Sequence, residues 1–118
     1  MSTKTNLWSY RSNLGEAANA RDLVGYDVHA TDGDIGKIDE ASADTSRQYL
    51  VVDTGFWIFG KKRMIPAGVI ETIDLDKEKV FVSLTKDQIK GAPDYDETLS
   101  QDAKYRDEVG AYYDPFRR

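Results

Sequence analysis

The side chain best suited to proton transfer in this sequence is His29, which is its single histidine. An imidazole titrates near neutral pH, and a neighbouring carboxylate such as Asp27 or Asp32 could orient it as a general base. A zinc site or a nucleophilic triad would depend entirely on this one imidazole, because the chain contains no cysteine. We interpret His29 as a surface residue at a strand end and keep an enzyme that uses it as a third hypothesis.

The run Asp32-Gly33-Asp34 resembles the beginning of a calcium-binding loop. A loop of the EF-hand type that starts at Asp32 needs Asp or Asn at its fifth position and Glu at its twelfth. Those positions hold Gly36 and Ala43. The Asp-Gly pair instead predicts a tight hairpin turn, because glycine adopts positive φ at little cost. We therefore expect no metal site and no cofactor.

The segment from Gly55 to Arg63 combines four consecutive large apolar residues with a basic run, in the order Gly-Phe-Trp-Ile-Phe-Gly-Lys-Lys-Arg. One face of a strand cannot bury four consecutive apolar side chains, so part of this run is expected on the surface as a protein or homodimer contact. Two alternatives stay open, which are the rim of the folded core and a nucleic-acid platform where rings stack on bases.

Aromatic residues near the end of the chain extend the candidate interaction surface. Because the formal net charge is −5 and the isoelectric point is about 4.8, phosphate backbones are repelled by the molecule as a whole. A protein partner is therefore favoured over nucleic acid, and no catalytic residue is assigned. The candidate surface residues are Phe56, Trp57, Phe59, Lys61, Lys62, Arg63, Tyr112 and Tyr113.

Short strands must position these residues, since residues 23–84 read as six strand-like runs separated by turn signals. In the last run, Val80, Val82 and Leu84 share one face and Phe81 points the other way. Pro66 has no amide hydrogen and is expected at a strand end or edge. The expected strands cover residues 24–30, 35–41, 49–54, 63–66, 69–75 and 79–84.

The two ends of the chain have a different character. Residues 1–20 lack a strand period and predict a flexible segment, in which Trp8 either docks on the domain or reaches a partner subunit. Residues 21–85 form the predicted domain, and residues 86–118 form a tail with short helices. Thr85 is a candidate helix N-cap, and residues 101–113 carry a weak helical stripe of Tyr105, Val109 and Tyr112.

The sequence does not decide whether the tail from Asp94 onward packs on its own domain or on a second subunit. No apolar run is long enough for a signal peptide or a membrane-spanning helix. We therefore expect a cytoplasmic protein without membrane insertion.

Five short motifs follow one another along the middle of the chain. They are Leu23-Val24-Gly25, Asp32-Gly33 with Ile35-Gly36-Lys37-Ile38, Tyr49-Leu50-Val51-Val52, the hairpin from Gly55 to Gly60, and Ile65-Pro66. This ordered set resembles the PRC-barrel family over about residues 20–85. The family includes the cytoplasmic domain of the photosynthetic reaction-centre H subunit and the C-terminal domain of a ribosome maturation factor.

The resemblance implies a mainly β fold, which is a small six-stranded barrel followed here by the short helical tail. It also implies an adaptor that acts through its surface, because the family has no shared catalytic residues. We therefore expect a non-catalytic, protein-interaction module that forms a homodimer. The alternative is an RNA- or ribosome-associated factor that uses Lys61, Lys62 and Arg63.

Overall fold

The structure is a computed structural model that describes residues 7–10, 14, 18, 22–42, 47–55, 62–99 and 102–116. All six expected strands are present, and the first begins at Asp27 rather than at residue 24. The strands are β1 (Asp27–Ala30), β2 (Gly33–Ala41), β3 (Tyr49–Asp53), β4 (Lys62–Pro66), β5 (Ile70–Asp74) and β6 (Lys79–Val82). The helices are η1 (Ala67–Val69), α2 (Lys86–Lys90), η2 (Glu97–Leu99), α3 (Ala103–Tyr113) and η3 (Asp114–Phe116).

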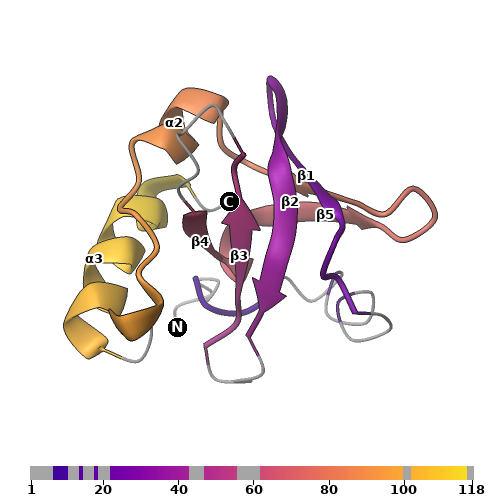
Figure 1. The fold of residues 1–118 in the computed structure, drawn as a ribbon. Coiled ribbons are helices and arrows are strands. Elements are labelled where there is room, and N and C mark those ends of the chain that lie inside the picture. The colour runs from indigo at the N-terminus through magenta and orange to yellow at the C-terminus, as the bar shows by residue number, and fades with distance from the viewer. Residues whose placement is uncertain are drawn as a thin grey trace, which may run out of the picture.

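The strands form one sheet in the order β4-β3-β2-β1-β6-β5. The β1–β6 pair is parallel and the other pairs are antiparallel. Irregular register in β1, β2 and β5 increases the local twist. Figure 1 shows the resulting curvature, because β5 passes across the direction of β2 and β3.

The expected closed barrel is wrong for this chain in one respect, since the sheet is not closed between β4 and β5 in the described residues. Pro66 ends β4 without an amide donor, and the 3₁₀ turn η1 then leads the chain into β5. The tail contacts β4 instead, where the amide of Tyr95 donates to the carbonyl of Lys62 at 2.9 Å. The architecture is therefore a strongly curved six-stranded sheet with a C-terminal helix.

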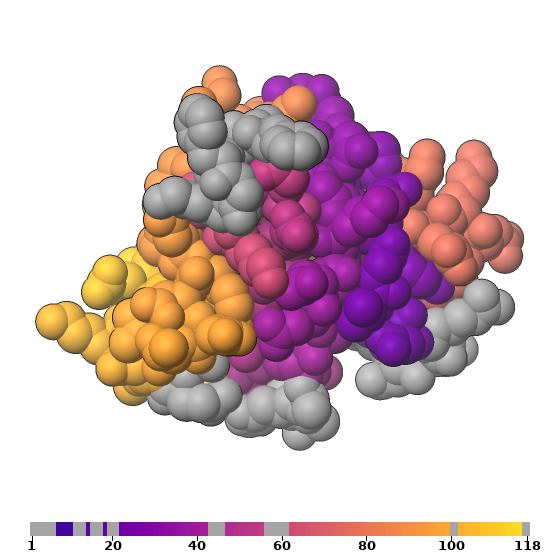
Figure 2. Space-filling view, viewed as in Figure 1, coloured from indigo at the N-terminus to yellow at the C-terminus, as the bar shows by residue number. Residues whose placement is uncertain are grey.

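The core lies inside this curve and is continuous from the sheet to the tail. In β1 and β6 every second residue is buried, as the period-2 pattern predicts. In β3, the four residues from Tyr49 to Val52 are all buried, because this strand lies between β2 and β4 and is covered on both faces. Figure 2 shows the tail packed along one side of the strands, with the β5–β6 hairpin protruding on the other side.

The tail packs on its own sheet through two capped helices. Thr85 and Gln88 form a capping box that starts α2, and the carboxylate of Asp32 accepts a hydrogen bond from the amide of Lys86 at 2.8 Å. The buried stripe of α3 contains Tyr105, Val109 and Tyr113 rather than the expected Tyr112. Among the described residues, no helix is long and apolar enough to span a membrane.

Candidate interaction surface

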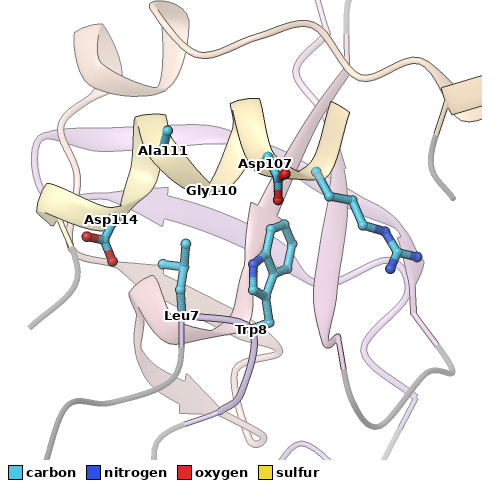
Figure 3. Close-up of a pocket in the computed structure, with 7 residues that line it drawn as sticks. Leu7, Trp8, Asp107, Gly110, Ala111 and Asp114 are labelled. Atoms are coloured by element: carbon cyan, nitrogen blue, oxygen red, sulfur yellow. The ribbon is translucent and has the colours of Figure 1, made fainter. Parts of the chain in front are cut away.

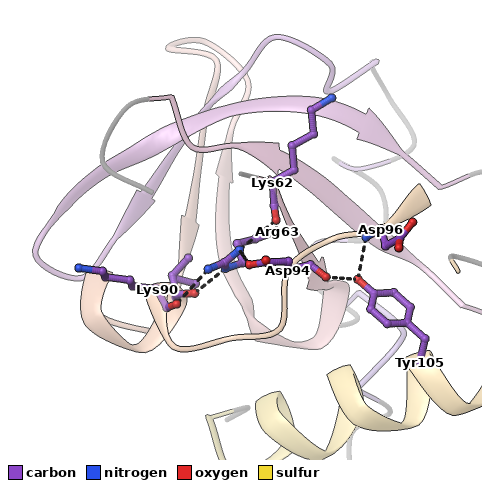
Figure 4. Close-up of polar contacts among 7 residues, drawn as sticks. Lys62, Arg63, Lys90, Asp94, Asp96 and Tyr105 are labelled. Atoms are coloured by element: carbon purple, nitrogen blue, oxygen red, sulfur yellow. Dashed lines mark hydrogen bonds and ion pairs between the residues drawn. The ribbon is translucent and has the colours of Figure 1, made fainter. Parts of the chain in front are cut away.

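Arg63 is the central polar residue where β4 meets the tail, and Figure 4 shows its contacts. Its side chain is only 4% exposed, and its Nη1 lies 2.7 Å from the carboxylate of Asp94. Its Nε and Nη2 donate to the carbonyls of Ile89 and Lys90, at 3.1 and 3.0 Å, at the end of α2. A guanidinium in this position supplies donors to carbonyls at a helix C-terminus, where the carbonyl of Ile89 also accepts from the amide of Ala92. Arg63 therefore joins parts of the fold and is not a surface cation.

Lys62 is partly exposed, but acidic groups surround its ammonium group. Its Nζ lies 2.8 Å from the carboxylate of Asp39 on β2. This hydrogen bond raises the pKa of Lys62, and the charges of Asp39, Asp53 and Glu40 act in the same direction. In the described part of the expected basic run, one cation is therefore buried and the other is paired.

Tyr112 and Tyr113 both lie at the end of α3, but neither presents its whole ring to solvent. Tyr113 is fully buried, and burial raises the pKa of its hydroxyl. Tyr112 is half-buried, donates its hydroxyl to the carbonyl of Gln88, and packs edge-to-face on Tyr113 at 5.3 Å between ring centroids. Tyr113 thus belongs to the core, and Tyr112 holds α3 against α2.

The remaining predicted surface residues lie outside the described residues. They fall in the connection between β3 and β4, whose last paired residues are Asp53 and Lys62. Their proposed role as a contact surface stays a prediction. These residues are Phe56, Trp57, Phe59 and Lys61.

His29 and its two neighbouring carboxylates have separate structural contacts. The ring of His29 stacks on Phe81 of β6, with 5.4 Å between centroids. Asp27 pairs with Lys37 at 2.7 Å, while Asp32 accepts from the start of α2. In the part of the chain that the structure describes, no group of three or more His, Asp or Glu side chains could hold a metal ion.

One row of charged residues crosses the outer face of the sheet, and only the pairing of the strands brings its members together. The strand register places one charged residue of each strand opposite the next, with signs that alternate from edge to edge. The hydrogen bond from Lys37 is the largest cause that lowers the pKa of Asp27. In sheet order the row is Lys62, Asp53, Lys37, Asp27, Lys79 and Asp74.

A groove lies between the N-terminal segment and α3, as Figure 3 shows. Its volume is about 330 Å³. Trp8 docks on the domain, as one of the two alternatives predicted, and packs edge-to-face on Tyr49 at 6.3 Å. The groove itself was not predicted, because its two walls come from opposite ends of the chain. Its lining residues are Leu7, Trp8, Arg106, Asp107, Gly110, Ala111 and Asp114.

The order of the strands and the pattern of short motifs define a β domain of the PRC-barrel type. Residues 15–89 match the family model described as the PRC-barrel domain, and the chain belongs to this family. The match covers the whole sheet and ends inside α2, so η2, α3 and η3 lie beyond it.

One solved structure to which part of the chain is similar is that of a 16S ribosomal RNA processing protein, RimM, from Pseudomonas aeruginosa. The two sequences are 22% identical, the TM-score is 0.47, and the match covers 55% of this chain but only 42% of that protein. These values are too low to transfer the role of that protein to this chain. No curated protein matches the sequence.

Proposed function

We propose that this protein is a non-catalytic interaction module of the PRC-barrel family that forms a homodimer through the connection between β3 and β4. The observation that carries the proposal is the position of Phe56, Trp57 and Phe59, which lie between the hairpin partners Asp53 and Lys62. These strands already have a filled core, because Leu50, Val51, Met64 and Ile65 are almost completely buried.

The size of this aromatic group is sufficient for a dimer contact. An aromatic side chain buries about 150–250 Å² when it is fully covered. Three such residues from each of two subunits would bury about 900–1,500 Å² in total, which reaches the lower range of specific interfaces. Further contacts from neighbouring strands would add to this area.

The contacts of the ionisable groups support a module that binds rather than one that catalyses. A catalytic site could use ionisable groups such as Asp27, Asp32 and Arg63. Each of these groups already makes a hydrogen bond or an ion pair within the fold. The alternative, an RNA- or ribosome-associated factor, requires Lys61, Lys62 and Arg63 to present their charges together. The burial of Arg63 and the pairing of Lys62 with Asp39 weaken the cationic surface that such a factor needs.

The proposal is tested by sedimentation of the wild-type protein at tens of micromolar beside two variants. We expect a dimer for wild type, a dimer for Trp57→Phe, and a folded monomer for Trp57→Glu, whose melting temperature is lower and no longer rises with protein concentration. The apolar ring in Trp57→Phe preserves the contact, whereas the buried charge in Trp57→Glu disrupts it. A wild-type monomer, or a Trp57→Glu variant that remains dimeric, would contradict the homodimer.

The same samples distinguish the alternative function. RNA binding that is measured at 50 mM salt and weakens steeply as the salt is raised would favour the ribosome-associated factor. Reduced binding in Lys61→Gln would locate it on the basic run.

A further inference from the structure

We propose that the groove between Leu7–Trp8 and α3 binds a basic peptide segment of a partner protein. This site lies in the tail region, away from the β3–β4 connection, and the inference does not depend on the proposed homodimer. Figure 3 shows Leu7 and Trp8 facing the helix that carries Asp107, Gly110 and Asp114.

Backbone hydrogen bonds fix the floor of the groove. The amide of Gly68 donates to the carbonyl of Leu7, and the amide of Gln48 donates to the carbonyl of Trp8, each at 2.7 Å. A Cβ atom at position 68 would lie 2.6 Å from the carbonyl oxygen of Leu7, so only glycine permits this approach. The N-terminal segment is thus held in place on the sheet, with Trp8 between Tyr49 and α3.

Two small residues of α3 create the space above this floor. Gly110 has no side chain, and a Cβ atom there would already lie 3.6 Å from the indole of Trp8. Ala111 lines the next part of the groove. The volume of about 330 Å³ between these walls accommodates a few side chains of a bound peptide.

The charge of the rim identifies the kind of peptide. Asp107 and Asp114 are both exposed and line the groove from the same end of the chain. Arg106 also lines the groove but is only 8% exposed, so the two aspartates are the more accessible charged residues of the rim. An indole beside carboxylates attracts a guanidinium or ammonium group through both its ring face and their charge. The same carboxylates repel the phosphates of nucleic acid.

The distance between the two carboxylates determines how far apart the basic residues of the bound peptide should lie. Seven residues of α-helix advance by about 10.5 Å, which separates Asp107 from Asp114 by two turns. In an extended polyproline-type peptide, residues three positions apart lie on the same side and about 9.3 Å apart. A segment with two basic residues three positions apart therefore matches the rim, with its middle residues over Leu7 and Trp8.

The test uses an acetylated Arg-Pro-Pro-Arg peptide as the probe and the fluorescence of Trp8 as the readout, in a Trp57→Phe background. We expect saturable binding that weakens about tenfold in Asp107→Asn, because one charge-assisted contact is lost. The matched control is Glu108→Gln, which removes the same charge from the next residue, outside the groove, and should change the affinity less than about twofold.

A second variant distinguishes binding in the groove from a general attraction of the peptide to the acidic surface of α3. Ala111→Leu fills the space with a good helix former, so the fold should persist by circular dichroism while peptide binding is lost. No binding at millimolar peptide, equal weakening in Asp107→Asn and Glu108→Gln, or full binding by Ala111→Leu would each overturn the proposal. If Arg-Pro-Arg bound as tightly as Arg-Pro-Pro-Arg, the assignment of Asp107 and Asp114 as partners of basic residues three positions apart would be wrong.

Discussion

At the residue scale, two tyrosines of α3 differ in whether their hydroxyl groups are hydrogen-bonded. Tyr105 donates its hydroxyl to the carbonyl of Asp94 at 2.9 Å. Tyr113 is fully buried, and its hydroxyl has no hydrogen-bond partner among the residues that the structure describes. A buried polar atom without a partner costs free energy, whereas a satisfied one contributes about 1 kcal/mol to stability. The two positions therefore form a matched pair for substitution by phenylalanine.

We predict that Tyr113→Phe leaves the free energy of unfolding unchanged or raises it by up to about 1 kcal/mol, because it removes an unsatisfied hydroxyl. Tyr105→Phe should lower it by about 1 kcal/mol, because it removes a satisfied one. Urea unfolding measures both values. If Tyr113→Phe proved the more destabilising of the two, its hydroxyl would have to be bonded in solution.

The same residue gives the stability a pH dependence. Burial raises the pKa of Tyr113 above its ordinary value of 10.0 and that of Tyr10 to about 12. The folded protein thus holds protons that the unfolded chain releases, so stability falls as the pH rises above about 10. Each such group contributes a slope of about 1.4 kcal/mol per pH unit, and Tyr113→Phe should remove the slope of Tyr113.

At the element scale, the alternating row of charges acts across all six strands. Each inner member faces opposite charges on its neighbouring strands, so no single pair is independent of the next. Cross-strand charge pairs favour one register and disfavour a slip that would bring like charges together. The row therefore supports the register that the apolar face also requires.

We predict that Lys37→Glu lowers the melting temperature by placing a carboxylate between Asp27 and Asp53. The exchange variant Asp27→Lys with Lys37→Glu should recover only part of the loss. It restores one pair, but it sets the introduced lysine against Lys79 and the introduced glutamate against Asp53. Complete recovery, measured by calorimetry, would show that Asp27 and Lys37 act as an isolated pair.

The contribution of this row of charges to stability depends on pH in a direction that the pKa of Asp27 defines. Because the pKa of Asp27 is lowered from 3.8 in the folded state, its contribution is present above that pH and is lost as the pH falls through the folded pKa. The difference in melting temperature between wild type and Lys37→Glu should therefore become smaller in acid.

At the scale of the whole molecule, Arg63 makes the sheet and the tail one unit. Its guanidinium contacts β4, the end of α2 and the chain at Asp94. A lysine cannot reproduce this set of bonds, because its single ammonium group lacks the planar fork of donors. Arg63 is thus the main buried polar link between sheet and tail, beside the shared apolar core and the hydrogen bond from Tyr95 to Lys62.

We predict that Arg63→Lys lowers the free energy of unfolding by about 2 kcal/mol, because one ammonium group cannot replace the several charge-assisted hydrogen bonds of the buried guanidinium. Asp94→Asn should cost about 1 kcal/mol or less, because this carboxylate is half-exposed. Far-ultraviolet circular dichroism and calorimetry should give one coincident transition in wild type. In Arg63→Lys the helical signal should be lost first, and coincident transitions would argue against this coupling.

Local patterns were sufficient to predict the strands, the Asp32-Gly33 turn and the N-cap at Thr85. The same reasoning placed Arg63 on the surface, because a basic run normally remains in water. Its burial depends on carbonyls and a carboxylate 26 to 31 positions away in the sequence. The helical stripe was placed on Tyr112 instead of Tyr113, because two adjacent tyrosines fit a weak period equally well.

The sequence by itself determined the six strands, their turns and the membership in the PRC-barrel family, because alternation and turn chemistry act between residues close in the chain. Only the tertiary structure decided that the sheet stays open between β4 and β5 in the described residues, that the tail covers β4, and that Trp8 meets α3. These features depend on which distant surfaces bury each other, and burial is a property of the packed molecule and not of any local run of residues.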